Sequence, residues 1–344
     1  MRVLVTGATG FIGGAVTREL LARGHAVRAL VRSGSRTDNL DALDGVERAV
    51  GDVLDRASVA RALAGCDAVV HTAGVVHFRP DDQARLFAVN ARSVEIVLGA
   101  ALEARVDRAV LTSSTAVLGG SATPRVMNEA SPSNAEALGI AYFVSKARGE
   151  RAALDAFRRG LPVVVVRPAF VLGPGDVYRS SAGLVLAIAR RQYPVYVSGG
   201  VSFCDVRDVA RGHVEALLRG RPGEAYILGG HNLELDELMR TVAQLAGITA
   251  PRRVPYALGY VLAAASEALD AARGKVPHLT RQLLASSHLY TYVTSAKAAD
   301  ELGYVIRPFE TSVRDTLRWF IEHGKLAPRT AQLREIAELP AAPP

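Results

Sequence analysis

The sequence predicts an α/β protein, with a doubly wound parallel sheet of Rossmann type followed by a smaller, mostly helical C-terminal lobe. Two observations predict the sheet. The chain opens with a strand, a glycine-rich turn and a helix, and apolar runs of strand length then alternate with helical segments as far as residue 167. Such alternation is typical of parallel strands whose connecting helices cover both faces. The scarcity of strand-like runs after residue 231 predicts the helical lobe.

The opening turn has the glycine spacing of an anion-binding site. Residues 2–6 form a short apolar run, and Gly7, Gly10 and Gly13 follow it. Gly7 allows a tight turn, Gly10 lets the backbone approach a pyrophosphate closely, and Gly13 lets the helix lie near the strand. The N–H groups at the start of that helix point at the anion. The turn residues expected to form this site are Gly7, Thr9, Gly10, Phe11, Ile12 and Gly13.

The remaining elements follow in chain order. Further strands are predicted at residues 25–31, 46–50, 67–71, 107–112, 161–167 and 225–228. Helices are predicted at residues 15–23, 56–64, 140–159 and 210–218, with two helical stretches inside 81–104. Gly24 and Asp55 are the residue types that end and begin such helices. Residues 173–194 mix loop and helix, so the chain is expected to leave the sheet there and return.

This order of elements divides the chain into two parts. Residues 1–172 plus about 198–230 form the nucleotide-binding domain, and residues 173–197 plus about 231–327 form the substrate lobe. Residues 328–344 are expected to be a flexible tail, since the end of the chain is rich in Ala and Pro. The apolar segment 256–269 is interpreted as a core helix or pocket wall, with an interfacial helix on a membrane as the alternative.

Composition limits the classes of function. With 344 residues, 49% of them hydrophobic, the chain can bury a large core. Lys and Arg outnumber Asp and Glu by 41 to 34, but the arginines are scattered without an aromatic-basic cluster, which argues against a nucleic-acid partner. Cys66 and Cys204 stand alone, so neither a disulfide framework nor a metal site is expected. With a strand at residue 2 and no apolar run of ~18 residues, we expect a cytoplasmic protein without a transmembrane segment.

Tyr142 and Lys146 form the strongest chemical signal. Residues four apart lie on the same face of a helix, so the ammonium group can stand beside the phenol. A cation in that position favours the phenolate and lowers the pKa of the tyrosine. The alternative is a chance pairing on an exposed helix face.

Thr112, Ser113 and Ser114 provide the second signal, because they end the strand predicted at 107–112. In a doubly wound fold, hydroxyl groups at the carboxyl end of a central strand face the ligand crevice. The alternative is a strand-end serine that only satisfies backbone groups.

Together, the glycine spacing after Thr6, the Tyr142–Lys146 pair and the segment TSSTAVLG resemble the extended short-chain dehydrogenase/reductase family. The resemblance covers the chain to about Phe320. It implies that Tyr142 is the general acid/base, that Lys146 lowers its pKa and binds the nicotinamide ribose, and that Ser114, with Ser113 as the fallback, holds the substrate oxygen. It implies a further catalytic role for Asn90. The other residues that it assigns to the cofactor are Asp52, Val53, Ala73, Gly74, Thr112, Pro168 and Val171.

The end of the strand at 25–31 bears on the choice of cofactor. An acidic residue there would favour NAD, whereas arginine suits the 2′-phosphate of NADP. Arg32 stands at that position with Arg36 nearby, and the first acid is Asp38. The sequence therefore predicts NADP, with NAD as the second choice.

Two stretches bear on the branch of the family. Val201-Ser202 stands where nucleotide-sugar enzymes carry an Arg-Asp-aromatic sequence. LVRS at 30–33 and GEAYILGG at 223–230 resemble dihydroflavonol reductases, 3-beta-hydroxysteroid dehydrogenases and hopanoid-associated sugar epimerases. The resemblance implies a homodimer that interconverts a ketone and a secondary alcohol on a hydrophobic substrate. The alternatives are a nucleotide-sugar epimerase/dehydratase and a non-catalytic sensor of NAD(P).

Overall fold

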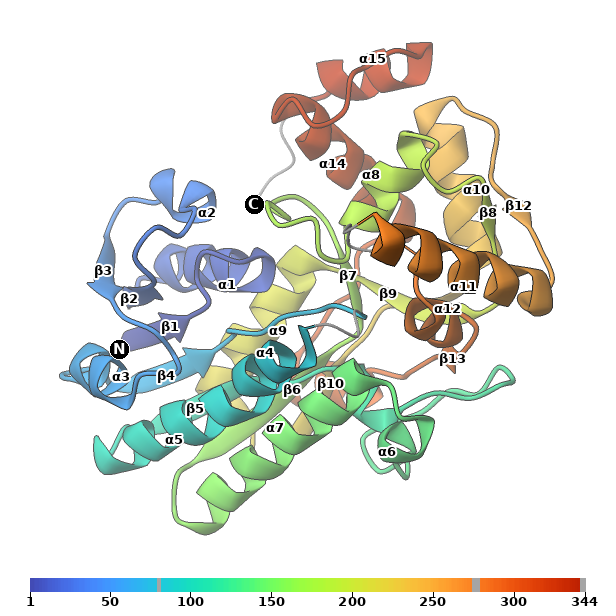
Figure 1. Ribbon diagram of the computed structural model, residues 1–344. Coiled ribbons are helices and arrows are strands. Elements are labelled where there is room, and N and C mark those ends of the chain that lie inside the picture. The colour runs from blue at the N-terminus through green and yellow to red at the C-terminus, as the bar shows by residue number, and fades with distance from the viewer. Residues whose placement is uncertain (79–81, 274–278, 341–344) are drawn as a thin grey trace.

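A seven-stranded parallel sheet is the centre of the computed structural model, which describes residues 1–78, 82–273 and 279–340 (Figure 1). The strand order is β10-β6-β5-β4-β1-β2-β3, and each neighbouring pair runs parallel. The predicted doubly wound sheet is therefore confirmed. Its strands are β1 (Arg2–Thr6), β2 (Ala26–Val31), β3 (Val46–Val50), β4 (Ala68–His71), β5 (Arg108–Thr112), β6 (Val163–Pro168) and β10 (Ala225–Leu228).

Alternation along β1 shows how the sheet is buried on both faces. Val3 and Val5 belong to the core that the helices α1 (Phe11–Ala22) and α9 (Val206–Arg219) cover. Leu4, on the opposite face, packs in a second core with residues of α3 (Arg56–Leu63), α5 (Ser93–Glu103) and α7 (Ala141–Arg158). Because successive side chains of a strand point to opposite faces, a strand covered on both sides must be apolar throughout.

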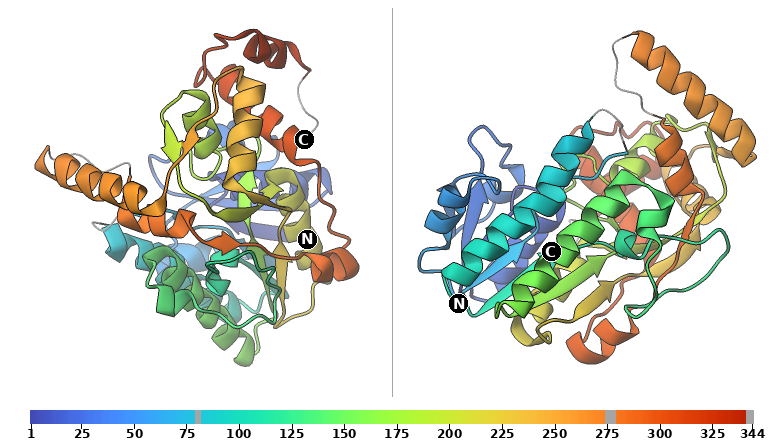
Figure 2. Two further views of the ribbon diagram at one scale, coloured as in Figure 1. Left: turned by 90° about the vertical axis from the view of Figure 1, so that its right-hand side faces the viewer. Right: turned by 60° about the horizontal axis from the view of Figure 1, so that its bottom comes forward.

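The helices of each face lie side by side (Figure 2). The Asp55 side chain accepts a hydrogen bond from the Ala57 N–H, at 3.0 Å, which confirms it as the cap of α3. The helix α9 begins four residues before its predicted start, because the Asp205 carboxylate accepts a hydrogen bond from the Arg207 N–H at 2.9 Å. Shorter helices in this half are α2 (Asp38–Asp41), α4 (Gln83–Phe87) and α6 (Ala135–Leu138), with a π-helix at Ala88–Arg92 and a 3₁₀ helix at Thr115–Leu118.

A second group of elements packs over the carboxyl edge of the sheet. It contains a small sheet in which β9 (Gly200–Asp205) pairs with β7 (Phe170–Leu172), β11 (His231–Glu234) and β13 (Tyr290–Thr291). A further pair joins β8 (Val195–Tyr196) to β12 (Arg252–Arg253). The sequence did not predict these strands, because they are short and their partners lie far away in the chain. The helices are α8 (Gly183–Ala189), α10 (Leu235–Ala246), α11 (Tyr256–Ala272), α12 (Arg281–Ser287), α13 (Ala296–Leu302), α14 (Phe309–Glu322) and α15 (Ala331–Glu338).

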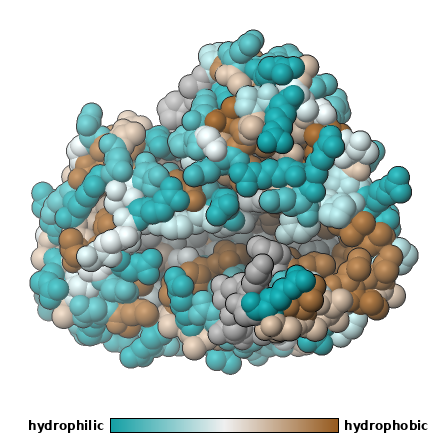
Figure 3. All heavy atoms as spheres, turned by 45° about the horizontal axis from the view of Figure 1, so that its top comes forward, coloured by the Kyte–Doolittle hydropathy of each residue, from teal (hydrophilic) through white to brown (hydrophobic). Residues whose placement is uncertain are grey.

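The helix α11 corrects one prediction. Residues 256–269 were expected to be a core helix or pocket wall, with an interfacial helix as the alternative, but α11 is not a core helix: it projects from the molecule (Figure 2), and Gly259 and Ala263 are its buried residues. Hydrophobic residues gather on the surface on the side of the molecule where α11 lies (Figure 3). Hydrophobicity alone could not distinguish a buried helix from an exposed one, because both have the same apolar composition.

The helix α15 corrects a second prediction, since its residues were assigned to a flexible tail. Thr330 caps this helix by accepting a hydrogen bond from the Leu333 N–H at 3.2 Å, and Leu333 and Ile336 are buried in the main core. Residues 341–344 of the predicted tail lie outside the described residues.

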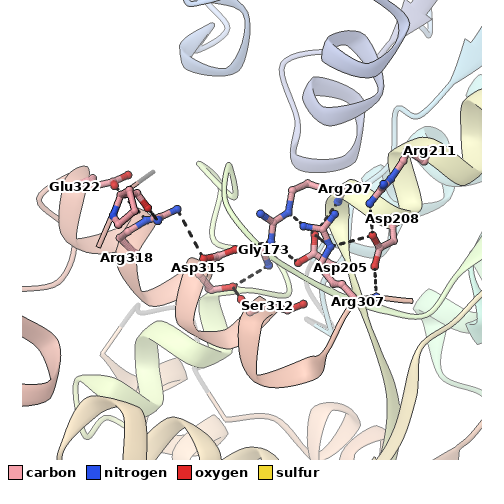
Figure 4. Close-up of polar contacts among 12 residues, drawn as sticks. Gly173, Asp205, Arg207, Asp208, Arg211, Arg307, Ser312, Asp315, Arg318 and Glu322 are labelled. Carbon is pink, nitrogen blue, oxygen red and sulfur yellow. Dashed lines mark hydrogen bonds and ion pairs between the residues drawn. The ribbon is translucent and has the colours of Figure 1, made fainter. Parts of the chain in front are cut away.

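A buried ion network joins α14 to the start of α9 (Figure 4). The Arg207 guanidinium donates two hydrogen bonds of 2.9 Å to the Asp205 carboxylate and one of 2.6 Å to Asp315 of α14. Arg207 is 7% exposed and Asp205 only 1%. Burial would raise the pKa of Asp205, but the hydrogen bonds and charge of Arg207 outweigh it and hold that pKa below its usual range.

A second part of the network fixes the segment between α13 and α14. The Asp208 carboxylate accepts hydrogen bonds from the Arg307 N–H at 2.8 Å and from the Arg307 side chain at 2.9 Å. Next to Asp315, the Thr316 hydroxyl accepts a hydrogen bond from the Gly173 N–H, at 2.8 Å. The strand β7, which ends just before Gly173, is thereby tied to α14.

Replacing Arg207 by Met is expected to destabilise the protein strongly, because Asp205 and Asp315 would lose their shared cation. The free energy of unfolding at neutral pH should fall by about 3 to 5 kcal/mol in urea denaturation. Since the pKa of Asp205 is lowered on folding, the stabilisation is present above its unfolded pKa of about 3.9 and is lost as the pH falls through the lower folded value.

Arg158→Met is the matched control, since Arg158 pairs with Asp155 where both side chains are at least 60% exposed. Its effect should be about 0 to 1 kcal/mol. Equal losses in the two variants would contradict a structural role for the buried network.

Candidate active site

Close approach of two chain segments explains the glycines of the first turn. Gly7 has φ of 71°, in the left-handed region that glycine adopts without strain. A Cβ on Gly7 would lie 2.6 Å from the Ala73 nitrogen, and one on Gly13 would lie 2.1 Å from the Gly7 carbonyl oxygen. The turn after β1 therefore lies against the turn after β4, and the start of α1 lies against both. The first N–H groups of α1 have no acceptor within the helix, which makes this helix start suitable for an anion.

Asn39 supports this turn, although no motif in the sequence selects it. Its side-chain amide donates hydrogen bonds of 3.0 Å to the carbonyl oxygens of Gly10 and Gly175, and the residue is buried. The turn after β1 is thereby tied to the loop that follows β7. The signal that could have found Asn39 is an asparagine in a short polar segment, which is too common in loops to be specific.

Asn90 lies in the π-helix that precedes α5, beside Gly74 and Lys146. A Cβ on Gly74 would lie 3.4 Å from the Asn90 amide oxygen and 3.5 Å from the Lys146 ammonium nitrogen. The Asn90 amide exchanges two hydrogen bonds of 2.9 Å with the backbone of Val75 and donates one of 3.0 Å to the Ser145 hydroxyl. These protein partners engage both the oxygen and the nitrogen of the Asn90 amide and hold the loop after β4 against α7.

The three hydroxyl residues at the end of β5 point in different directions. Thr112 bonds through its hydroxyl to the ring of His213 at 2.8 Å, on the α9 side of the sheet. Ser113 donates a hydrogen bond of 2.7 Å to the Glu150 carboxylate on α7. Ser114 accepts a hydrogen bond from the Ala116 N–H at 3.2 Å, and its hydroxyl lowers the pKa of the nearby Tyr142 phenol. Of the two serines, Ser114 therefore lies at the phenol, while Ser113 is engaged by Glu150.

Tyr142 is half-buried among apolar side chains. Its ring meets Phe78 edge-on, with 5.9 Å between the centroids. The cluster around it contains residues from the 3₁₀ helix, α6, α7 and the lobe: Ala116, Ala135, Leu138, Ile140, Phe143 and Leu289. Burial raises the pKa of the Tyr142 phenol, and the Ser114 hydrogen bond opposes that rise. The net direction is a raised pKa, in contrast to the lowering expected from Lys146, because burial outweighs the effect of Ser114.

Lys146 lies one helical turn after Tyr142 and is 9% exposed. Its ammonium group donates a hydrogen bond of 2.9 Å to the Thr112 carbonyl oxygen. Burial lowers its pKa to about 8, although the negative charge of Glu150 acts in the opposite direction. Glu150 is itself paired with Arg167 of β6, through a bond of 3.1 Å and a second, shorter contact.

The predicted cofactor residues lie along the carboxyl edge of the sheet, but they are not equally accessible. Arg32, after β2, is exposed and takes part in none of the ion pairs among the described residues, whereas Arg36 is paired with Asp38 at 2.7 Å. After β3, the Asp52 carboxylate accepts a hydrogen bond from the Leu54 N–H at 2.9 Å, and Val53 packs on the second core. Thus Arg32, and not Arg36, is available to a phosphate.

Pro168 and Val171 are predicted cofactor residues whose side chains are buried in the protein. Pro168 ends β6 in a buried position, and the Val171 side chain packs in the main core. Even so, the glycine turn, Lys146 beside Gly74 and the cationic Arg32 together fit an elongated ligand that carries phosphate groups.

The family match agrees with this geometry. Residues 3–229 match the family described as "NAD dependent epimerase/dehydratase family".

Three relatives are similar over nearly their whole length. A putative dihydroflavonol 4-reductase of Synechocystis is 35% identical over 93% of this chain and 94% of its own. Sterol demethylase protein B of Methylococcus capsulatus is 34% identical over 95% of this chain and 100% of its own. A farnesyl-dihydroquinoline-oxide ketoreductase of Stigmatella aurantiaca is 32% identical over 92% of this chain and 96% of its own.

Solved structures show the same fold. The crystal structure of gox2253 superimposes with a TM-score of 0.83 at 38% identity and covers 94% of this chain and 99% of that protein. The dTDP-glucose 4,6-dehydratase DesIV of Streptomyces venezuelae, solved with NAD bound, gives a TM-score of 0.76 at 26% identity and covers 94% of this chain and 97% of its own.

Proposed function

The chain belongs to the NAD dependent epimerase/dehydratase family of extended short-chain dehydrogenases/reductases, and on this premise we propose that it reduces a ketone on a hydrophobic substrate to a secondary alcohol, with a preference for NADPH. The observation that carries the proposal is the apolar cluster around the Tyr142–Ser114 pair. A substrate oxygen placed at that pair would have its neighbouring carbons among Phe78, Phe143 and Leu289, and an apolar substrate gains most from such a wall.

The raised pKa of Tyr142 favours the reductive direction. A phenol that keeps its proton throughout the neutral range can donate it to a ketone oxygen as that oxygen gains negative charge. Ser114, whose oxygen accepts a hydrogen bond from the Ala116 N–H, keeps its own O–H and can donate a second hydrogen bond to that substrate oxygen. The proposed roles are therefore general acid for Tyr142 and orientation of the carbonyl group for Ser114.

Lys146 and Asn90 are assigned supporting roles. Lys146 places a cation within one helical turn of Tyr142, held by the Thr112 carbonyl oxygen, and is expected to bind the ribose of the cofactor. Asn90 holds the loop after β4 in place through Val75 and Ser145, which makes it a positioning residue.

The residues present fit a dinucleotide cofactor. The turn from Gly7 to Gly13 and the start of α1 would hold its pyrophosphate, and Arg32 would meet a 2′-phosphate. A nicotinamide cofactor supplies hydride chemistry when it is bound. We also propose that the protein works in the cytoplasm as a homodimer.

Two other functions are the alternatives to ketone reduction. The similarity to a dTDP-glucose 4,6-dehydratase favours a nucleotide-sugar epimerase/dehydratase, but the apolar wall at Tyr142 is a poor surface for a sugar. A non-catalytic sensor would have no need for Tyr142 and Lys146 one helical turn apart on α7.

A panel of ketones tests the proposed activity. Steroid, flavonoid and long-chain ketones, incubated with NADPH or NADH, should include at least one that consumes the reduced nicotinamide, followed by its absorbance. Nucleotide sugars should leave the absorbance unchanged and should not stabilise the protein in a thermal shift assay. Strong stabilisation by nucleotide sugars alone would favour the epimerase alternative.

Tyr142→Phe is expected to lower the turnover number by roughly 10²–10⁴, because it removes the proton donor and keeps the ring. The affinity for NADPH, measured by fluorescence titration, should change little. Ser113→Ala is the matched control, since Ser113 is engaged by Glu150, and it should retain most of the activity that Ser114→Ala loses.

The pH profile of the same reaction provides an independent check. The rate of ketone reduction should decrease as the pH rises through about 8, where Lys146 loses its charge. The Lys146→Met variant should lose most of the rate, and its remaining rate should not show this decrease near pH 8.

Full activity in Tyr142→Phe with a verified substrate would exclude the catalytic assignment of Tyr142.

Arg32→Asp is expected to reverse or abolish a preference for NADPH over NADH, since the carboxylate would repel the 2′-phosphate. Fluorescence titration of both cofactors measures this change. Arg36→Asp is the control with a smaller effect, because Arg36 is already paired with Asp38. If the unmodified protein bound both cofactors equally, Arg32 would have no role in selectivity.

A further inference from the structure

The outer face of α11 is apolar along the whole helix. At 100° per residue, its outward residues fall within an arc of about 140° of the helix surface. All are exposed and none is polar: Ala257, Leu258, Val261, Leu262, Ala265, Ala268, Leu269 and Ala272. We call this set the α11 apolar face. Val261 is 63% exposed and Leu269 is 50% exposed. Such a continuous apolar surface usually marks an interaction site.

The polar residues of α11 face the protein instead of the solvent. Glu267 accepts hydrogen bonds of 2.7 and 2.8 Å from Arg281, and the Ser266 hydroxyl donates to Asp270 at 3.3 Å. On the same side, the buried Gly259 and Ala263 lie against the lobe. This arrangement is the reverse of an ordinary surface helix, which turns its apolar stripe to the core.

We propose that the α11 apolar face inserts into the surface of a lipid bilayer that contains anionic lipids. Exposed arginines stand at both ends of the helix, Arg252 before it and Arg273 after it, where they can meet anionic headgroups; Arg253 adds to them, although it also lies 3.8 Å from Asp236. The formal net charge of +7 adds to this attraction. Among the residues that the structure describes, no helix has the length and composition to cross a membrane, so the contact lies in the interface.

A second copy of the chain fits this face less well. A helix of 17 residues is about 25 Å long and about 10 Å wide, so that its outer face offers about 250 Å² to a partner. A standard protein interface buries about 800 Å² on each partner. A bilayer has no such requirement, because it can surround a single projecting helix.

The position of α11 connects the bilayer to the candidate active site. The helix packs on α12, and Thr280, which caps α12, donates a hydrogen bond of 3.0 Å to the Phe78 carbonyl oxygen. Phe78 in turn contacts the Tyr142 ring. A bilayer at the α11 apolar face would therefore lie next to the segment that contacts Tyr142, and a lipid-dissolved ketone would leave it close to the candidate active site; this part of the inference rests on the proposed function, whereas membrane binding does not.

Vesicle flotation of the full-length protein, without substrate or cofactor, tests the proposal. The protein should float with vesicles of phosphatidylcholine mixed with phosphatidylglycerol, and less with phosphatidylcholine alone. The triple variant Leu258→Ser, Val261→Ser and Leu269→Ser should lower binding by about tenfold or more. Replacing Arg252, Arg253 and Arg273 by Gln should reduce binding to the anionic vesicles only.

Val50→Ser combined with Val305→Ser is the matched control, since these side chains are 73% and 70% exposed elsewhere on the molecule. This control should float like the unmodified protein, and the thermal unfolding midpoints of all the variants should agree closely. Absence of flotation with anionic vesicles would overturn the proposal. So would light scattering in which the triple serine variant turns a dimer into a monomer, because the face would then be a protein interface. If the unmodified protein floated with anionic vesicles but reduced none of the ketones, the proposed function would be rejected and the membrane proposal would stand.

Discussion

The buried cation of Arg207 is the interaction on which the arrangement of the two halves depends. One guanidinium is shared between Asp205, where β9 becomes α9, and Asp315 in the middle of α14. All three groups are buried, so removing the guanidinium would leave Asp205 and Asp315 with only the longer contacts of Arg307 (3.6 Å) and Arg318 (3.7 Å) in a medium of low polarity. The lobe therefore has a defined position over the carboxyl edge of the sheet, and the loop after β7 is held there through Thr316 and Gly173.

In the candidate active site, too, polar contacts between segments fix the positions of neighbouring side chains. Groups that face away from the crevice set the positions of those that face into it. Glu150 engages Ser113 and Arg167 behind Lys146, and Asn90 binds the loop after β4 to α7. Tyr142 lies within the apolar cluster, and in the proposed function its hydroxyl and that of Ser114 set the position of the substrate oxygen.

The lobe departs from ordinary burial at α11. A globular protein normally gains stability by turning leucine and valine inward, yet α11 keeps its carboxylates on the protein side, where Arg281 compensates Glu267. Such an exposed face lowers solubility unless a partner covers it. A membrane contact next to the wall of the active site would give this departure a use, since hydrophobic substrates concentrate in lipid.

The sequence by itself determined the sheet, because strand-length runs that alternate with helical segments are typical of a parallel sheet with helices on both faces. It also determined the glycine turn and the proximity of Tyr142 to Lys146, because both are local in the chain. Tertiary structure alone decided which serine meets the phenol, since Ser113 and Ser114 differ only in the face that they present. It also decided the direction of the Tyr142 pKa, which depends on burial by Phe78 and Leu289 from distant segments. The outward orientation of α11, the short strands beside β9 and the packed helix α15 likewise depend on non-local partners, which composition does not reveal.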